Sequence, residues 1–197
     1  NFKLPDLVIV IEEPELYQHP GRQRHLAQIL LQLATGKTPG VAEKTQIIYA
    51  THSPLFVGID RFDQIRLLKK ISYATDKPKI TKIISTSLEK VAEAIWEADG
   101  KSSEKYTKET LLPRLQTIMT PWMNEGFFAD VAVLVEGEGD RAAIIGAAKV
   151  LGHDLESKGY CIIPCGGKTS MDRPAVIFKQ LGISVYIIWD SDKEEGK

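Results

Sequence analysis

The stretch "VAVLVEGEGD", Val131–Asp140, places a run of five apolar residues directly before a cluster of acidic ones. The run Val131–Val135 has the length and composition of a strand buried in a parallel sheet. Glu136 follows it at once, Gly137 allows a tight turn, and Asp140 falls in the first turn of the helix expected next. The stretch therefore predicts a buried strand whose carboxyl end carries two carboxylates.

Strand and helix patterns continue to alternate after this stretch. The predicted elements are a helix over Asp140–Leu151, a strand over Tyr160–Pro164, a helix over Asp172–Leu181 and a strand over Ser184–Trp189. Alternation at this spacing is typical of a parallel sheet with right-handed crossovers. Ligands bind such sheets beyond the carboxyl ends of the strands, so the residues that follow each strand are the candidates for function.

A second acidic pair, Asp190 and Asp192, follows the last of these strands. Residues two apart in an extended chain point to the same side, so we expect both carboxylates to join Glu136 and Asp140 at one edge of the sheet. Four carboxylates packed together repel one another unless a cation is present. Oxygen ligands of this kind suit Mg²⁺ or Mn²⁺, and a pair of such ions supports in-line attack on a phosphodiester.

Each acidic pair taken alone has a simpler explanation. An acid at the start of a helix is more often a cap or an exposed residue, and an Asp-x-Asp sequence after a strand is common in loops. The combination of both pairs in one αβ unit, with "CGGK" at the end of the strand between them, is more specific. It favours metal-dependent chemistry over two unrelated exposed turns.

The amino-terminal part of the chain also sets acids behind a strand. In "LVIVIEEPE", Leu7–Glu15, an apolar run precedes Glu12 and Glu13. An amphipathic helix follows, and a second buried strand, Gln46–Ala50, leads into "THSP". Glu12 could hold Mg²⁺, Glu13 could polarise a water for attack on a γ-phosphate, and His52 could hydrogen-bond a phosphate oxygen.

The middle of the chain has a different pattern. The stretches "DQIRLLKK" and "KITKIIST" predict a pair of strands joined around Asp76–Pro78. Apolar residues at helical spacing from Leu88 to Ile95 predict one helix, and a second is predicted over Thr110–Asn124. The best domain boundary therefore lies in this helical region, between about Thr86 and Asp130.

The stretch "VIVIEEPELYQHP", together with "ATHSP", resembles the back half of the ABC-type ATPase head found in SMC, Rad50 and OLD (overcoming lysogenisation defect) proteins. This resemblance implies that Glu12 is the Walker B acid and Glu13 the catalytic glutamate, although the family's usual residue at the first position is Asp. It also implies that His52 is the switch histidine. The stretch around His19 and Pro20 resembles the D-loop, which faces a partner head.

The stretch "FFADVAVLVEGEGDRAA" resembles OLD nucleases at the point where the ATPase head joins a Toprim domain, the fold shared by topoisomerases, primases and nucleases. By this resemblance Glu136 and Asp190 are catalytic, and the metal-binding acids are Glu136, Asp140, Asp190 and Asp192. Glu138 and Glu194 are possible further ligands. Lys168 is either a contact to DNA phosphate or an exposed loop lysine, and the sequence leaves both open.

The resemblance predicts an α/β fold in three parts. Residues 1–86 form the carboxyl-terminal half of an ABC-type ATPase sheet, with its Walker B strand, D-loop and switch-histidine loop. Residues 87–130 form a helical connector. Residues 131–197 form the amino-terminal half of a Toprim-like parallel αβ domain.

The function implied by the resemblance is an ATP-binding and ATP-hydrolysing DNA endonuclease that cuts phosphodiester bonds with Mg²⁺ or Mn²⁺. Its cofactors are then the divalent metal and ATP, and its substrate is DNA. We expect a cytoplasmic protein that forms a homo-oligomer through the ATPase head, with an accessory partner possible. The family implies a role in bacterial defence against phage.

Composition narrows the remaining choices. The formal net charge is −1, so there is no global basic field to attract nucleic acid, and the two cysteines do not form a disulfide framework. No apolar run reaches the ~18 residues of a membrane span.

No G-x-x-x-x-G-K-[ST] motif occurs, and "GGKTS" at Gly166–Ser170 has the wrong spacing for one. We therefore expect this chain to be an internal piece of a longer protein whose phosphate loop lies upstream.

Two other functions remain open at this point. One is a Toprim enzyme of another class, a topoisomerase or a primase, which an active-site tyrosine or a template-binding domain would reveal. The other is an ATP-driven DNA-binding sensor or scaffold without nuclease activity. Acids at all four Toprim positions argue against the second alternative.

Overall fold

The computed structural model describes residues 6–36, 44–72, 78–102 and 104–191. The chain separates into two compact units, residues 1–57 and residues 58–197. The predicted Asp192 and Glu194 lie outside the described residues. Within the described ranges no helix has both the length and the apolar character needed to cross a bilayer.

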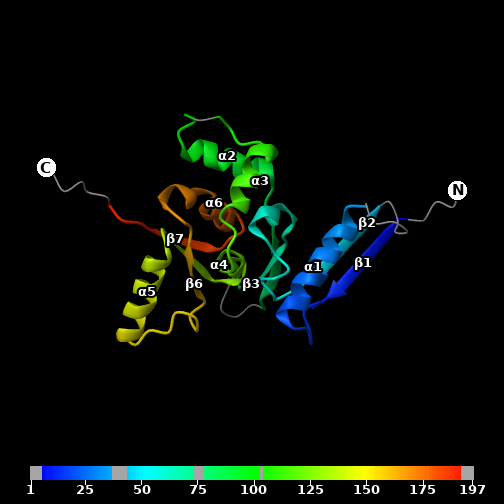
Figure 1. Ribbon diagram of the computed structural model, residues 1–197, viewed down its shortest axis with the longest axis horizontal. Helices are drawn as coiled ribbons and strands as arrows, with labels where there is room; N and C mark the ends of the chain where they lie inside the picture. Colours follow the sequence, from blue (N-terminus) through cyan, green and yellow to red (C-terminus); the bar gives the residue numbers. More distant parts are fainter. Residues whose placement is uncertain (1–5, 37–43, 73–77, 103, 192–197) are drawn as a thin grey trace. The chain divides into compact units, whose positions relative to one another are not determined.

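The first unit is a single strand–helix–strand crossover (Figure 1). Strand β1 (Leu7–Glu12) pairs in parallel with β2 (Thr45–Ala50), and the register runs from Leu7 opposite Thr45 to Glu12 opposite Ala50. Helix α1 (Pro20–Ala34) connects them, with Pro20 in its first turn, where a missing N–H costs nothing. The register brings the carboxyl ends of the two strands to the same edge.

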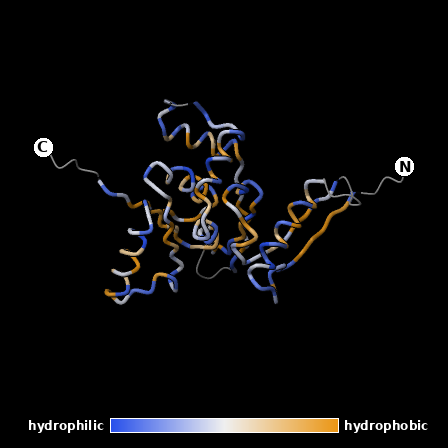
Figure 2. Tube along the Cα trace, in the orientation of Figure 1, coloured by the Kyte–Doolittle hydropathy of each residue, from blue (hydrophilic) through white to orange (hydrophobic). Residues whose placement is uncertain are grey.

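The strands of this unit are less buried than the sequence predicts. Val8 is 59% exposed and Val10 is 73% exposed, while Ile9 and Ile11 are half-buried. Figure 2 shows that β1 is apolar along its length. The expectation that β1 and β2 are buried strands is therefore wrong for the described structure. Among the described residues of this unit, α1 is the helix that packs against β2, so the two strands have one covering layer.

The second unit is built around a three-stranded parallel sheet of order β6-β5-β7 (Figure 1). These strands are β5 (Val131–Val135), β6 (Tyr160–Pro164) and β7 (Ser184–Ile188). Helix α5 (Glu138–Val150) connects β5 to β6, and α6 (Asp172–Gln180) connects β6 to β7. The alternating pattern predicted from the sequence is confirmed, and β5 is the buried central strand that it requires.

An antiparallel hairpin precedes this sheet in the same unit. Strand β3 (Leu67–Ile71) pairs with β4 (Ile80–Ile84), as predicted. The ammonium group of Lys69 donates a hydrogen bond of 2.8 Å to the carbonyl of Gly182, in the turn between α6 and β7. The hairpin thus belongs to the same compact unit as the β6-β5-β7 sheet. The domain boundary predicted in the helical region, between about Thr86 and Asp130, stays a prediction.

The helical region differs from the prediction in one respect. After α2 (Leu88–Ala98), the single helix expected over Thr110–Asn124 is two helices, α3 (Lys108–Gln116) and α4 (Pro121–Glu125). Thr120 caps α4, because its hydroxyl accepts a 3.1 Å hydrogen bond from the Met123 backbone. Apolar spacing continues across the break, which is why periodicity alone does not reveal it.

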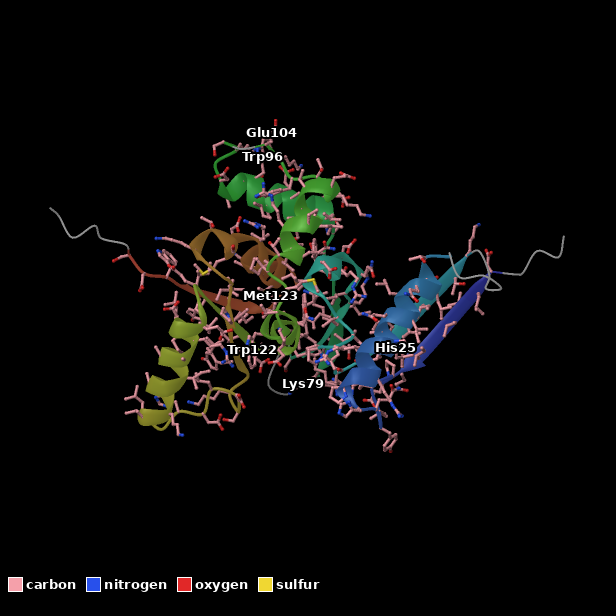
Figure 3. The ribbon with its side chains drawn as sticks, viewed as in Figure 1. His25, Lys79, Trp96, Glu104, Trp122 and Met123 are labelled. Carbon is pink, nitrogen blue, oxygen red and sulfur yellow. The ribbon has the colours of Figure 1, made fainter. Side chains whose placement is uncertain are left out.

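The core of the second unit lies between the sheet, α6 and the segment that leads into β5. Met123 of α4 is fully buried (Figure 3), and the rings of Phe127 and Phe178 meet edge-to-face at 5.2 Å. A Cβ atom at Gly126 would lie 2.6 Å from the Phe178 ring. This close packing fixes the start of β5, and therefore the place where Glu136 leaves the strand.

Candidate active sites

The acids at the end of β1 meet the turn that follows β2. The backbone N–H of Glu13 donates a 2.8 Å hydrogen bond to the Ala50 carbonyl, and Glu13 has a φ of +46°. The chain therefore turns sharply out of the strand at this residue. Oε1 of Glu13 lies 3.8 Å from Nε2 of His52. The structure thus brings together Glu13 and His52, two of the residues that the sequence assigned to ATP chemistry.

The other two residues of this predicted site have different surroundings. Glu12 is the last residue of β1 and is exposed, opposite Ala50 in the register. His19 is the N-cap of α1, and its Nδ1 accepts a 3.2 Å hydrogen bond from the backbone N–H of Gly21. His19 therefore caps a helix in this structure, and its place in the D-loop stays a prediction.

Glu15 is a residue whose importance the sequence did not reveal. Its Oε2 accepts a 2.8 Å hydrogen bond from the Thr51 hydroxyl, and its Oε1 accepts one of 2.7 Å from the His52 backbone N–H. Burial opposes ionisation, but these hydrogen bonds outweigh it and hold the pKa of the Glu15 carboxyl below its usual value. The sequence offered one signal, the acidic run "EEPE", and this run does not show which groups Glu15 bonds to.

At the edge of the second sheet, Glu136 and Asp190 are brought together. The backbone N–H of Asp190 donates a 3.0 Å hydrogen bond to Oε1 of Glu136. Strands β5 and β7 are parallel neighbours with Val135 opposite Ile188, so the residues that follow them leave the sheet at the same edge. The backbone of Asp190 therefore lies beside the Glu136 carboxylate at this edge, and the predicted convergence of the four carboxylates stays a prediction.

Asp140 has a local structural role at the same edge. Its Oδ2 accepts a 3.0 Å hydrogen bond from the backbone N–H of Gly137, at the start of α5. This is the helix-capping arrangement that the sequence alone could not separate from metal binding. Glu138 is exposed in the first turn of the same helix. Only one oxygen of Asp140 is used by this cap, so the carboxylate keeps a second oxygen for another ligand.

The loop after β6 closes over the backbone of this site. The backbone N–H of Gly167, with a φ of +131°, donates a 2.8 Å hydrogen bond to the carbonyl of Glu136. The neighbouring Lys168 donates a 3.2 Å hydrogen bond from Nζ to the carbonyl of Asp190. A residue with a side chain would be strained at this φ, so Gly167 allows the loop to place Lys168 beside the two acids.

The described residues contain no cluster of three or more His, Cys, Asp or Glu side chains arranged to hold a metal ion. Asp192, the fourth predicted ligand, is outside those residues. Burial is the main reason that the pKa of the Cys161 thiol is raised to about 11 and that of Cys165 to about 12. Both thiols are therefore protonated near neutral pH and are poor metal ligands.

Comparison with known protein families divides the chain in the same way. The model of an AAA ATPase domain matches residues 3–57. The model described as "Overcoming lysogenization defect protein-like, TOPRIM domain" matches residues 127–192. The first match contains β1, β2 and the Glu13–His52 contact. The second contains β5, β6, β7 and the Glu136–Asp190 contact.

Two curated relatives match nearly the whole chain. The OLD nuclease of Thermus scotoductus (strain ATCC 700910 / SA-01) is 30% identical over 191 residues, which cover 93% of this chain and 30% of that protein. The Old nuclease of Escherichia phage P2 is 27% identical over 193 residues, 96% of this chain and 28% of that protein. The chain thus spans less than a third of the length of these relatives. The two relatives and the two domain matches together show that the chain belongs to the OLD family.

Proposed function

We propose that the full-length protein is a DNA endonuclease that needs Mg²⁺ or Mn²⁺, with cutting controlled by an ATP-hydrolysing head. The observation that carries this proposal is the Glu136–Asp190 contact at the carboxyl edge of the Toprim-matched sheet. Carboxylates gathered at such an edge are the ligand set that hard divalent cations prefer. The Glu13–His52 contact in the ATPase-matched unit supports the second activity.

The carboxylates proposed as ligands at the Toprim edge keep oxygens that a divalent cation could use. Glu136 uses Oε1 for the Asp190 backbone and Asp140 uses Oδ2 for the helix cap, so each has a second oxygen outside these bonds. We propose that Glu136, Asp140, Asp190 and Asp192 would hold the metal, with Glu138 and Glu194 as further ligands. When bound, the cation supplies charge neutralisation of the phosphate and lowers the pKa of a water nucleophile.

The protein's own groups then have separate tasks in DNA cutting. Glu136 and Asp190 are the proposed catalytic residues, because both follow strands that end at this edge, where parallel αβ sheets bind their ligands. Lys168, whose Nζ donates a 3.2 Å hydrogen bond to the Asp190 carbonyl, would contact a phosphate oxygen of the DNA backbone. The Gly166–Gly167 turn lets that backbone approach closely, since neither residue has a side chain.

In the ATPase head, each predicted residue has its own proposed role. Glu12 would hold Mg²⁺ with the nucleotide, and Glu13 would accept a proton from the attacking water. His52, beside Glu13, would donate a hydrogen bond to the γ-phosphate. His19 and its neighbours would face a second head. The unit 1–57 is thus proposed as the core of the carboxyl-terminal half of an ABC-type head extending to about residue 86, with a connector over 87–130 and the first half of a Toprim domain over 131–197.

The setting of this activity is also a proposal. A homo-oligomer formed through the head follows from the D-loop assignment, and an accessory partner remains possible. The name of the phage P2 relative and the family's own description support a part in the conflict between bacteria and phage. The cytoplasm is the proposed site of action, because the DNA substrate is found there.

The proposal is tested by incubating the full-length protein with supercoiled plasmid. Nicked or linear DNA should form with Mg²⁺ or Mn²⁺ and should not form with a chelator. A protein that relaxes the plasmid without leaving strand breaks would instead be a topoisomerase. DNA that stays intact with either metal, with and without ATP, would contradict the nuclease assignment.

The metal should also change the stability of the protein. A ligand that binds only the folded state at one hundred times its dissociation constant adds about 2.7 kcal/mol to the free energy of unfolding. We therefore expect Mg²⁺ or Mn²⁺ to raise the melting temperature of the wild type, and to raise that of Asp190→Asn less, because a neutral amide is a weaker ligand. Without metal, Asp190→Asn should be at least as stable as the wild type, because it relieves repulsion between carboxylates.

Thermal melts with chelator and with metal measure this difference. Glu156→Gln is the matched control, since this exposed acid precedes β6 at the opposite edge of the sheet and also loses one negative charge. The control should respond to metal as the wild type does. Equal responses of all three proteins would mean that Asp190 does not contribute to a metal site.

A further inference from the structure

The carboxylate of Glu15 joins the segment after β1 to the segment after β2. Its two oxygens accept hydrogen bonds from different groups, 2.8 Å from the Thr51 hydroxyl and 2.7 Å from the His52 backbone N–H. The Thr51 hydroxyl in turn accepts a 3.0 Å hydrogen bond from the Ser53 backbone N–H, so its proton is directed at Glu15. Glu15 therefore bonds directly to Thr51 and His52, and Thr51 connects it to Ser53.

A second connection supports the first. The Ser53 hydroxyl donates a 2.9 Å hydrogen bond to Oε1 of Gln23 in α1. The amide nitrogen of Gln23 donates a 3.0 Å hydrogen bond to the Gln18 carbonyl and a longer one of 3.4 Å to the carbonyl of Glu15. The turn after β2 is thus held against the β1–α1 connection at two places, and Glu15 provides the charged one.

The histidine that this network holds has little else to fix it. The side chain of His52 is 86% exposed, so packing contributes little to its orientation, yet its Nε2 lies 3.8 Å from Oε1 of Glu13. The position of its backbone therefore determines where the imidazole can reach. Hydrogen bonds to an ionised acceptor are about twice as strong as neutral ones, so the bond to Glu15 is a strong restraint on the backbone of His52.

We propose that Glu15 is a positioning residue for ATP hydrolysis, which holds His52 beside Glu13 so that both side chains face the γ-phosphate together. The inference rests on the function proposed for this site. Glu15 would touch neither the nucleotide nor the attacking water, and it would act through the backbone of His52. Displacing a reacting group by about 1 Å can cost about 100-fold in rate, so the loss of this restraint should reduce turnover more than nucleotide binding.

The test uses the full-length protein and measures kcat and KM for ATP hydrolysis together with the dissociation constant for ATP. Glu15→Ala should lower kcat by about 10–100-fold, the cost found for residues that orient the ligands of a metal site. The ATP dissociation constant should change little. Glu15→Gln keeps an acceptor for the His52 N–H and should retain more activity than Glu15→Ala. Asp6→Ala, which removes an exposed acid at the other end of β1, should behave as the wild type.

A double-substitution cycle separates positioning from a general structural role. If Glu15 acts through His52, Glu15→Ala should cause no further loss of kcat in a His52→Ala background, because the group it orients is already absent. Additive losses in the double variant would overturn the inference, and so would a Glu15→Ala protein with the kcat of the wild type. If Glu15→Ala does not fold, the same cycle with Glu15→Gln decides the question.

The failure of this inference can be distinguished from failure of the proposed function. Wild-type protein that hydrolyses ATP, and loses that activity in Glu13→Gln, supports the ATPase site whatever Glu15 does. Additive losses alongside that result would remove only the role of Glu15. Wild-type protein without ATP hydrolysis would overturn both.

Discussion

Replacing Glu136 or Asp190 by alanine in the full-length protein should abolish metal-dependent cutting of DNA. Loss of a residue that merely orients a metal ligand costs about 10–100-fold in metal affinity or activity, so loss of a proposed ligand should cost at least about 100-fold. The two positions are in contact through the Asp190 backbone and a Glu136 oxygen, so both substitutions should affect one site. Plasmid nicking measured over time with Mg²⁺ or Mn²⁺ gives the rates.

The fold should survive both substitutions. Asp190 is exposed and Glu136 is half-buried, so neither substitution leaves a cavity in the core. Thermal melts in chelator and the rate of ATP hydrolysis should therefore stay near the wild-type values. Glu156→Gln again serves as the charge control and should cut normally. If Glu136→Ala and Asp190→Ala both cut DNA at the wild-type rate, the nuclease site lies elsewhere.

Glu13→Gln should leave ATP bound but nearly stop its hydrolysis. The amide keeps the shape of the side chain and cannot accept a proton from water, and a general base of this kind is worth about 100-fold to 10,000-fold in rate. Because Glu13 turns out of β1 with a φ of +46° and its carboxylate lies 3.8 Å from His52, its loss should affect kcat rather than nucleotide binding.

Phosphate release and ATP binding, measured on the same preparation, give both quantities for this variant. Asp6→Ala is the control, because it removes an exposed acid from the same unit at the far end of the strand. Unchanged turnover in Glu13→Gln would mean that another residue serves as the base. If turnover falls as expected, the effect of the same variant on DNA cutting shows whether ATP hydrolysis drives the nuclease or restrains it.

Much of the Toprim-like part could be predicted because its signals are local. A short apolar run followed by acids predicts a strand with carboxylates at the edge where parallel strands end, and β5, paired on both sides, fits this pattern. The same reasoning placed Asp190 beside Glu136 from sequence alone. The role of Asp140 could not be decided in this way, because an acid in the first turn of a helix fits a cap and a metal ligand equally well.

Other features could not be predicted because they depend on contacts between distant parts of the chain. Glu15 and His52 are far apart in sequence, and only the parallel pairing of β1 with β2 brings their segments together. The break between α3 and α4 has a different cause, because the Thr120 cap is a local contact that apolar periodicity does not register. The exposure of Val8 and Val10 depends on what covers β1, and composition alone carries no information about that.

The central claim is that the acids at the carboxyl edge of the β6-β5-β7 sheet form a metal site. Its most direct test is an anomalous difference map from crystals of the full-length protein grown with Mn²⁺. The claim predicts a manganese peak beside the carboxylates of Glu136 and Asp190, and its loss in crystals of Asp190→Ala. A well-ordered edge with no peak at a saturating Mn²⁺ concentration, or a peak that persists unchanged in Asp190→Ala, would contradict the claim.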